Sequence, residues 1–301
     1  MKITLEEQLH QHYAQKFHIQ KLLYEQKTEH QHLVIFENTI YGRVMALDGI
    51  IQTTERDEFI YHEMFAHVPL FAHPNPKKVL IIGGGDGGLL REVLRHPSVE
   101  QATLVEIDSS IIQISQKFLP KHSQGAFHHP KTEIIIDNGL HFAEKTDRLF
   151  DVILCDSTDP IGPGADLFGK KFYQYMQNIL KPGGIFVAQN GVSLLQEEEG
   201  YQTRSILKTL FPFQGHYHAT VPSYIGGNMQ LAWASTQIDL KHPDQLTLES
   251  KVNKLALPLR YYNLGMHQAA FQLPEYLTAG LQNYLKKHPQ PQGKSHANHL
   301  N

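Results

Sequence analysis

The stretch KVLIIGGGDGG at residues 78–88 decides the fold of this chain. An apolar run ends in a loop in which Gly83, Gly85 and Gly88 match the G-x-G-x-x-G spacing, and the following LLREVLRH has the pattern of a helix. The next apolar run ends at Glu106, at about the distance where an acid accepts hydrogen bonds from a ribose diol. Strand, glycine loop, helix and acid together predict an adenosine-containing ligand at the carboxyl ends of parallel strands.

From residue 77 onward, apolar strands alternate with amphipathic helices. Strands that are apolar throughout belong to a parallel sheet with both faces covered, so the pattern predicts a doubly wound, Rossmann-like α/β sheet. The runs HYHATV and MQLAWA can add edge strands, and residues 245–282 have the pattern of a small helical closure. We expect the main domain at residues 56–284, followed by a disordered, polar and Pro-rich tail at residues 285–301.

The chain before the main domain is rich in strand signals. Asp48-Gly49 between apolar runs predicts a hairpin, because both central residues of such a turn need a positive φ. Three runs form the expected β-meander, namely HLVIF (32–36), YGRVMAL (41–47) and IIQTT (50–54). We therefore expect a small N-terminal β-stranded domain at residues 1–55, with a helix beginning near residue 57.

Composition excludes several classes of function. The chain has 301 residues, 41% of them hydrophobic and 19% charged, which is typical of a globular protein. A net charge of −3 gives no basic field for nucleic acid, and no apolar run approaches the roughly 18–20 residues of a membrane span. The N-terminal MKITLEEQLH lacks the apolar core of a signal peptide, so we expect a cytoplasmic protein. The 20 histidines lack the paired spacing of a zinc site, so no metal is expected.

Asp86 separates two classes of adenosine-containing ligand. Its carboxylate lies inside the glycine loop, at a helix N-terminus where a dinucleotide would place its pyrophosphate. Two anions would repel each other there, so a cationic ligand fits better than NAD. The segment LKPGG at residues 180–184 resembles the turn before the fifth strand in many S-adenosylmethionine-dependent transferases. The expected sheet is therefore of the methyltransferase type.

Two further acids, Asp156 and Asp159, follow the apolar run FDVILC in the segment DSTDPIGPG. They could serve only as a cap or an Asx turn at the start of a loop. That alternative leaves Asp86, which is aimed at the same crevice, unexplained. Converging acids suit a sulfonium donor and an amine acceptor, because an alkyl ammonium has a pKa of about 10.4 and needs a base before it can attack.

These segments resemble the spermidine synthases, a family of polyamine aminopropyltransferases. The resemblance runs from about Gln31 to about Pro274 and includes YGRVMALDGIIQTTERDEFIYHEM (41–64), KVLIIGGGDGG, VEID (105–108), DSTDPIGPG, FVAQNG (186–191) and RYYN…H…AAF.LP (260–274). It implies transfer of an aminopropyl group from decarboxylated S-adenosylmethionine to an amine, usually putrescine, giving spermidine and methylthioadenosine. The donor is then a co-substrate, with no separate cofactor, and a homodimer or homotetramer is expected.

The resemblance also implies roles for single residues. Asp156 would be the base that deprotonates the amine, and Asp86 would hold the ammonium group of the donor. The amine would contact four residues, namely Asp159, Tyr61, His62 and Tyr224. Gln189 would either contact the amine or only cap the sheet. The sugar and adenine of the donor would contact Gln31, Glu106, Asn138, Gly139 and Pro163. The family usually has Asp at position 138, and an Asn amide can still accept one hydrogen bond from the adenine amine.

Two alternatives remain at this point: an amine N-methyltransferase that uses intact S-adenosylmethionine, and a sensor of polyamines or nucleosides without catalysis. Asp86 opposes the first, because intact S-adenosylmethionine carries a carboxylate where the decarboxylated donor does not. The length of the acceptor amine stays open, since the depth of a pocket sets it.

Overall fold

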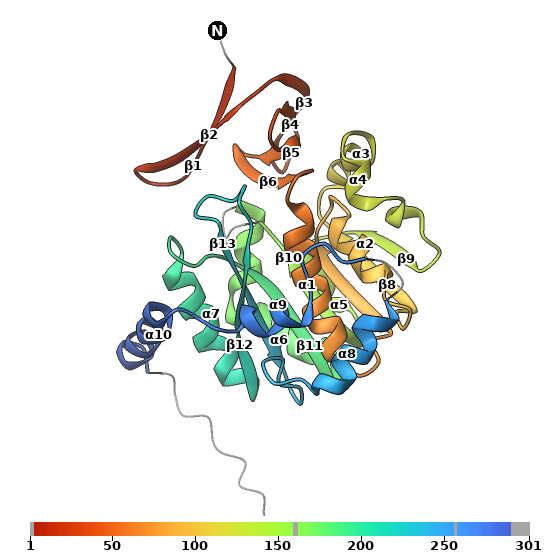
Figure 1. The fold of residues 1–301 in the computed structure, drawn as a ribbon, viewed down its shortest axis with the longest axis vertical. Coiled ribbons are helices and arrows are strands. Elements are labelled where there is room, and N and C mark those ends of the chain that lie inside the picture. The colour runs from red at the N-terminus through yellow and green to blue at the C-terminus, as the bar shows by residue number, and fades with distance from the viewer. Residues whose placement is uncertain (1–2, 159–161, 256–257, 290–301) are drawn as a thin grey trace, which may run out of the picture.

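The computed structural model describes residues 3–158, 162–255 and 258–289. Six short strands precede a large mixed sheet covered by helices. In Figure 1 these six strands lie above one end of the strands of that sheet. No helix of the described ranges is long and apolar enough to span a bilayer. The predicted disordered tail begins within helix α10 (Glu275–Lys287), and its residues from 290 onward lie outside the described part.

The N-terminal strands form two antiparallel units. A hairpin consists of β1 (Thr4–His10) and β2 (Tyr13–His18), and a four-stranded sheet consists of β3 (Lys21–Lys27), β4 (His32–Asn38), β5 (Gly42–Leu47) and β6 (Ile50–Thr54). The predicted meander over residues 32–54 is confirmed, and Asp48 and Gly49 at its turn have φ of 50° and 81°. The strands before residue 28 were not predicted singly, because exposed polar residues dominate them.

The large sheet has seven strands in the order β12-β13-β11-β10-β7-β8-β9. Its parallel part consists of β7 (Lys78–Gly83), β8 (Gln101–Glu106), β9 (Thr132–Ile136), β10 (Phe150–Asp156) and β11 (Leu180–Val192). The runs expected at the edge form the antiparallel strands β12 (Phe213–Thr220) and β13 (Asn228–Ser235). Strand order reverses between β7 and β10, which confirms the doubly wound fold and places a ligand crevice at their carboxyl ends.

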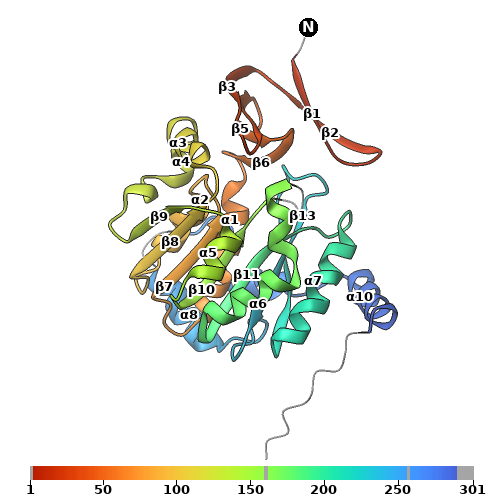
Figure 2. The same cartoon turned by 180° about the vertical axis from the view of Figure 1, so that it is seen from behind.

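Helices cover both faces of this sheet (Figures 1 and 2). One face packs against α1 (Glu58–Ala72), α2 (Gly88–Leu94), α8 (Gln245–Lys254) and α9 (Leu264–Ala270). The other face packs against α5 (Gly139–Lys145), α6 (Lys170–Ile179) and α7 (Glu197–Leu210). The remaining elements are α3 (Ser109–Phe118), α4 (Pro120–Ser123), and the 3-10 turns at Ala126–His128 and Gly162–Phe168. Two apolar cores therefore fix the strand ends that carry the candidate site.

Candidate active site

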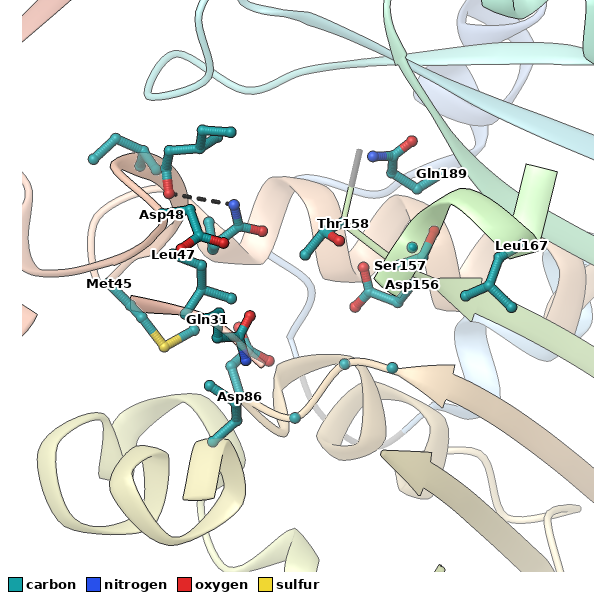
Figure 3. A pocket seen from close by; sticks show the side chains of 18 of the residues that line it. Gln31, Met45, Leu47, Asp48, Asp86, Asp156, Ser157, Thr158, Leu167 and Gln189 are labelled. Atoms are coloured by element: carbon teal, nitrogen blue, oxygen red, sulfur yellow. Dashed lines mark hydrogen bonds between the residues drawn. The ribbon is translucent and has the colours of Figure 1, made fainter. Parts of the chain in front are cut away.

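A cavity of about 230 Å³ lies where the carboxyl ends of the parallel strands meet the N-terminal sheet. In Figure 3, Asp156, Ser157 and Thr158 lie on the side of the large sheet, across from Met45 and Leu47 of the N-terminal sheet. Most of the residues predicted for the site line this cavity, namely Gln31, Tyr61, His62, Asp86, Glu106, Asn138, Gly139, Asp156, Gln189 and Tyr224. Asp159 and the side chain of Pro163 lie outside the described part of the chain, so their roles stay predictions.

Asp156 is the last residue of β10, where it pairs with Gly83 at the end of β7. The Tyr61 hydroxyl on α1 donates a hydrogen bond of 2.7 Å to its Oδ1. Burial and the nearby Asp86 carboxylate raise the pKa of Asp156 to about 6, although His62 and the Tyr61 hydrogen bond oppose the rise. A carboxylate with this pKa is ionised at neutral pH and can still accept a proton, as a general base must.

Asp86 lies in the loop between β7 and α2 and is only 7% exposed. Its Oδ1 accepts a hydrogen bond of 2.8 Å from the backbone N–H of Gly88, at the start of α2. Its Oδ2 lies 3.5 Å from Nε2 of His62. The carboxylate is therefore held by the helix N-terminus with one oxygen directed to the cavity wall that His62 forms.

His62 on α1 is 2% exposed and contacts a second carboxylate on the same helix. Its Nδ1 donates to Oε2 of Glu58 over 2.6 Å, one helical turn away. Burial alone would lower the pKa of His62, but the carboxylates of Asp86 and Glu58 raise the pKa to about 9. The sequence predicted a polar contact at this position; with a pKa of about 9 the side chain is an imidazolium at neutral pH.

Glu106 is the last residue of β8 and is 7% exposed. Its Oε1 accepts a hydrogen bond of 3.0 Å from the backbone N–H of Asp108, while burial raises the pKa of Glu106 to about 7. A Cβ atom at Gly85 would lie 2.7 Å from Glu106 Oε2, so the middle glycine of the loop leaves room for this acid. Gln31 lies in the turn between β3 and β4 and donates from Nε2 to Asp108 over 3.2 Å. The sugar contacts predicted for Gln31 and Glu106 thus share one corner of the cavity.

Asn138 and Gly139 form the start of α5 beside the same corner. Oδ1 of Asn138 caps the helix, accepting hydrogen bonds of 2.9 Å and 3.2 Å from the backbone N–H groups of Leu140 and His141. The acceptor expected for the adenine amine is therefore already used by the helix. Recognition of adenine at Asn138 stays a prediction.

Tyr224 and Gln189 also line the cavity. The Tyr224 hydroxyl donates to the carbonyl of Gln52 on β6 over 2.8 Å, and its ring meets the Tyr61 ring edge to face at 5.8 Å. The Gln189 side chain is buried on β11, and its Oε1 accepts from the backbone N–H of Gly191 over 2.8 Å. Both side chains have the polar atoms that an amine substrate requires, in fixed positions.

Sequence reasoning missed the acid Glu7, which lines the cavity from hairpin β1–β2. Glu7 is 1% exposed, and its Oε2 accepts a hydrogen bond of 2.8 Å from Nε2 of Gln15. The same amide donates to the carbonyl of Ser223, which ties the hairpin to the main domain. An acid in a polar, exposed-looking strand carries no local signal of burial, because only tertiary contacts bury it.

Acids from five described segments of the chain thus line the cavity, namely Glu7, Asp48, Asp86, Glu106 and Asp156, and the cationic His62 lies among them. Such a site can bind positively charged reactants and remove a proton from one of them. Across the described ranges, no group of three or more His, Cys, Asp or Glu side chains is arranged to hold a metal ion. The expectation of no cofactor stays a prediction.

Comparison with known proteins identifies relatives along most of the chain. The family model of the spermine/spermidine synthase domain matches residues 58–242, and that of the spermidine synthase tetramerisation domain matches residues 4–55. A polyamine aminopropyltransferase of Serratia proteamaculans is 51% identical over 275 residues, covering 91% of this chain and 96% of that protein. One of Sodalis glossinidius is 52% identical over 278 residues, covering 92% and 97%.

A solved structure agrees with these relatives. The crystal structure of a spermidine synthase in complex with the transition-state analogue AdoDATO superposes with a TM-score of 0.88. It is 40% identical in sequence and covers 93% of this chain and 95% of that one. The resemblance noted in the sequence is therefore confirmed over both the N-terminal strands and the large sheet. The chain belongs to the spermine/spermidine synthase family.

Proposed function

We propose that this protein transfers the aminopropyl group of decarboxylated S-adenosylmethionine to putrescine, giving spermidine and 5′-methylthioadenosine. The observation that carries the proposal is the pair of buried acids Asp86 and Asp156 at the carboxyl ends of β7 and β10. One acid can bind the ammonium of the donor, and the other can accept a proton from the attacking amine. The aminopropyltransferase relatives favour this reaction over the N-methyltransferase alternative.

Proton removal is the demanding step for this site. Transfer from an alkyl ammonium with a pKa of about 10.4 to a carboxyl with a pKa of about 6 costs about 6 kcal/mol. The cationic donor reduces that difference, because two like charges 4 Å apart repel by about 4 kcal/mol at an effective dielectric of about 20. Placing the donor sulfonium beside the amine therefore makes the ammonium a stronger acid and eases transfer of its proton to Asp156.

The reaction then proceeds as a direct displacement. The neutral amine attacks the methylene carbon next to the sulfonium, the carbon–sulfur bond breaks, and its electron pair stays on the sulfur of methylthioadenosine. Asp156 keeps the proton, while Tyr61 holds the carboxylate in line through its hydrogen bond. The protein contributes alignment, exclusion of water and the base.

The acceptor requires a site for its second ammonium group as well. Glu7 is buried in the cavity wall and belongs to the N-terminal hairpin, whereas Asp156 belongs to the large sheet. A diamine such as putrescine presents one positive charge at each end, so one end can meet Glu7 while the other is deprotonated at Asp156. This arrangement supports a diamine over a monoamine acceptor.

The variant Asp156→Asn tests the proposal. Turnover of putrescine with decarboxylated S-adenosylmethionine should fall by orders of magnitude, while calorimetry should show that methylthioadenosine still binds. The near-isosteric amide keeps the shape of the site and removes only the base. Near-normal turnover in this variant would reject the assignment, and a panel of amines read by mass spectrometry would define the acceptor range.

Assembly and location complete the proposal. The match of residues 4–55 to a tetramerisation domain supports a homodimer or homotetramer built through the N-terminal strands. The mass of the full chain in solution, measured by light scattering, tests this: a monomer would contradict it. We also propose that the enzyme works in the cytoplasm without a bound cofactor, on small molecules and not on nucleic acid.

A further inference from the structure

Buried ion pairs join helices α1 and α2 directly behind the cavity. Arg91 on α2 donates from Nη2 and Nη1 to the two carboxylate oxygens of Glu58 on α1, over 2.9 Å and 3.2 Å. The same Nη1 donates to the backbone carbonyl of His122 over 2.6 Å. The Glu58 side chain is 7% exposed and cannot turn to solvent. Arg91 therefore fixes the orientation of the carboxylate that contacts His62.

This carboxylate determines where the protons of His62 lie. An ionised carboxylate only accepts hydrogen bonds, so Nδ1 of His62 must carry a proton toward Glu58 over 2.6 Å. The other ring nitrogen, Nε2, lies 3.5 Å from Asp86 Oδ2, which is also an acceptor. A ring with acceptors at both nitrogens is stable as the doubly protonated imidazolium.

The last glycine of the loop pattern is required by the same ring. A Cβ atom at Gly88 would lie 2.3 Å from Nδ1 and Cε1 of His62. The ring thus lies against the first turn of α2, and no larger residue fits between them. The sequence pattern that suggests nucleotide binding here also makes room for a cation.

We propose that Glu58 is a positioning residue that keeps His62 as the resident imidazolium of the acidic cavity, and that Arg91 only anchors the Glu58 carboxylate. The inference rests on the proposed function and deepens it, because it says how the base stays ionised before the cationic reactants arrive. Neither residue lines the cavity, and both act through His62. His62 in turn faces Asp86 directly and lowers the pKa of Asp156.

The other charged or titratable groups around the ring agree with this assignment. On its own helix, His62 has Glu58 and the edge of the Tyr61 ring. From the glycine loop and β10 it faces the carboxylates of Asp86 and Asp156. The remaining neighbours are Arg91 on α2, which opposes the positive charge, and His122 on α4, whose ring lies 6.5 Å away. Burial lowers the pKa of His122, so the cation resides on His62.

Two substitutions that break the same ion pair separate positioning from structural damage. Glu58→Gln removes one of the two carboxylates that favour the charge of His62, so the imidazolium is less stable and Asp156 loses part of the nearby positive charge. The pKa of Asp156 should then rise, so the acidic limb of the pH profile of kcat/KM should move to higher pH by about one unit. Arg91→Gln breaks the same ion pair and leaves the Glu58 carboxylate hydrogen-bonded to His62, so any loss of kcat/KM should be equal at every pH and the limb should keep its position. An unmoved limb in Glu58→Gln would overturn the proposal, as would equal shifts in the two variants.

Glu92→Gln is the matched control. Glu92 is buried next to Arg91 on α2 and accepts from Arg91 Nε over 2.8 Å, while its other carboxylate oxygen contacts His67 and Arg95. The same chemical change there should lower the melting temperature and leave the acidic limb in place. A limb that moved as far in Glu92→Gln as in Glu58→Gln would show that any loss of an Arg91 partner is sufficient, which would refute the role of His62.

A spectroscopic measurement on the unaltered chain does not depend on the folding of any variant. With histidine labelled by nitrogen-15, both ring nitrogens of His62 should have protonated chemical shifts at pH 7.5, with the signals assigned by their loss in His62→Gln. An unprotonated Nε2 would overturn the proposal even if the enzyme makes spermidine. Failure to make spermidine together with a doubly protonated His62 would instead reject the proposed reaction and leave the imidazolium established.

Discussion

Replacing Tyr61 by Phe removes one hydrogen bond from Asp156 and leaves the packing of the aromatic ring in place. The bond is 2.7 Å long and inside a buried site, and a hydrogen bond to a charged group contributes about 1.5–3 kcal/mol. One pKa unit corresponds to 1.36 kcal/mol, so the pKa of Asp156 should rise by about 1–2 units from its value of about 6. The ionised fraction of the base at pH 7 then falls from about nine-tenths to between roughly one-half and one-tenth.

The assay is the ratio of kcat/KM between the unaltered chain and Tyr61→Phe, measured with putrescine from pH 6 to pH 9. The ratio should be about 2- to 10-fold larger at pH 7 than at pH 9, where both bases are ionised and only the loss of alignment remains. Tyr224→Phe is the control, because the Tyr224 hydroxyl donates to the Gln52 carbonyl and should leave the pH dependence unchanged. A ratio for Tyr61→Phe that is constant across this pH range would refute the reasoning.

The other predictions concern the two ends of the cavity. Glu7→Gln should raise the KM for putrescine about tenfold or more, because one ammonium group of the diamine loses its charged partner. The affinity for methylthioadenosine should stay unchanged. An unchanged KM would show that Glu7 does not bind the acceptor. Glu106 has a pKa raised to about 7, so it becomes protonated as the pH falls through that value and can then accept fewer hydrogen bonds from the ribose. The dissociation constant of methylthioadenosine, measured by calorimetry, should therefore rise about tenfold from pH 8 to pH 6, and a flat profile would exclude Glu106 as the sugar ligand. Gly85→Ala would place a Cβ atom 2.7 Å from Glu106 Oε2 and should abolish this binding, whereas Gly169→Ala, where a Cβ meets no atom within 4 Å, should have no effect; normal binding by Gly85→Ala would contradict the close packing.

The strands and loops that surround the site could be predicted from the sequence, because each of them has a pattern within a few neighbouring residues. Apolar runs separated by a glycine loop identify parallel strands and their carboxyl ends, which share one edge of the sheet. Asp86, Glu106 and Asp156 each follow such a strand, so their convergence could be predicted before any contact was known. The hairpin at Asp48-Gly49 was predictable for the same reason, since the turn chemistry is contained in two residues.

The remaining features depend on contacts that no local pattern encodes. Glu7 becomes buried only because hairpin β1–β2 folds over the main domain, where Gln15 reaches the carbonyl of Ser223. The pairing of Glu58 with Arg91 joins residues 33 positions apart on different helices, and each looks like an ordinary exposed charge in the sequence. Asn138 lines the cavity, but its capping of α5 depends on where the first turn of that helix begins, which no local pattern fixes.

The arrangement of charges also favours binding of the reactants over retention of one product. In the proposed reaction, Asp86 and Asp156 face two cationic reactants, and the positive charge of His62 offsets part of the repulsion between the two acids. Displacement converts the sulfonium into a neutral thioether, and the proton released by the amine neutralises Asp156. The attraction that held the donor sulfur and the base together is thus lost in the same step that forms the product. While Asp156 is ionised, the negative charge at the centre of the cavity therefore favours binding of the cationic reactants. Once Asp156 is protonated, that attraction no longer holds methylthioadenosine.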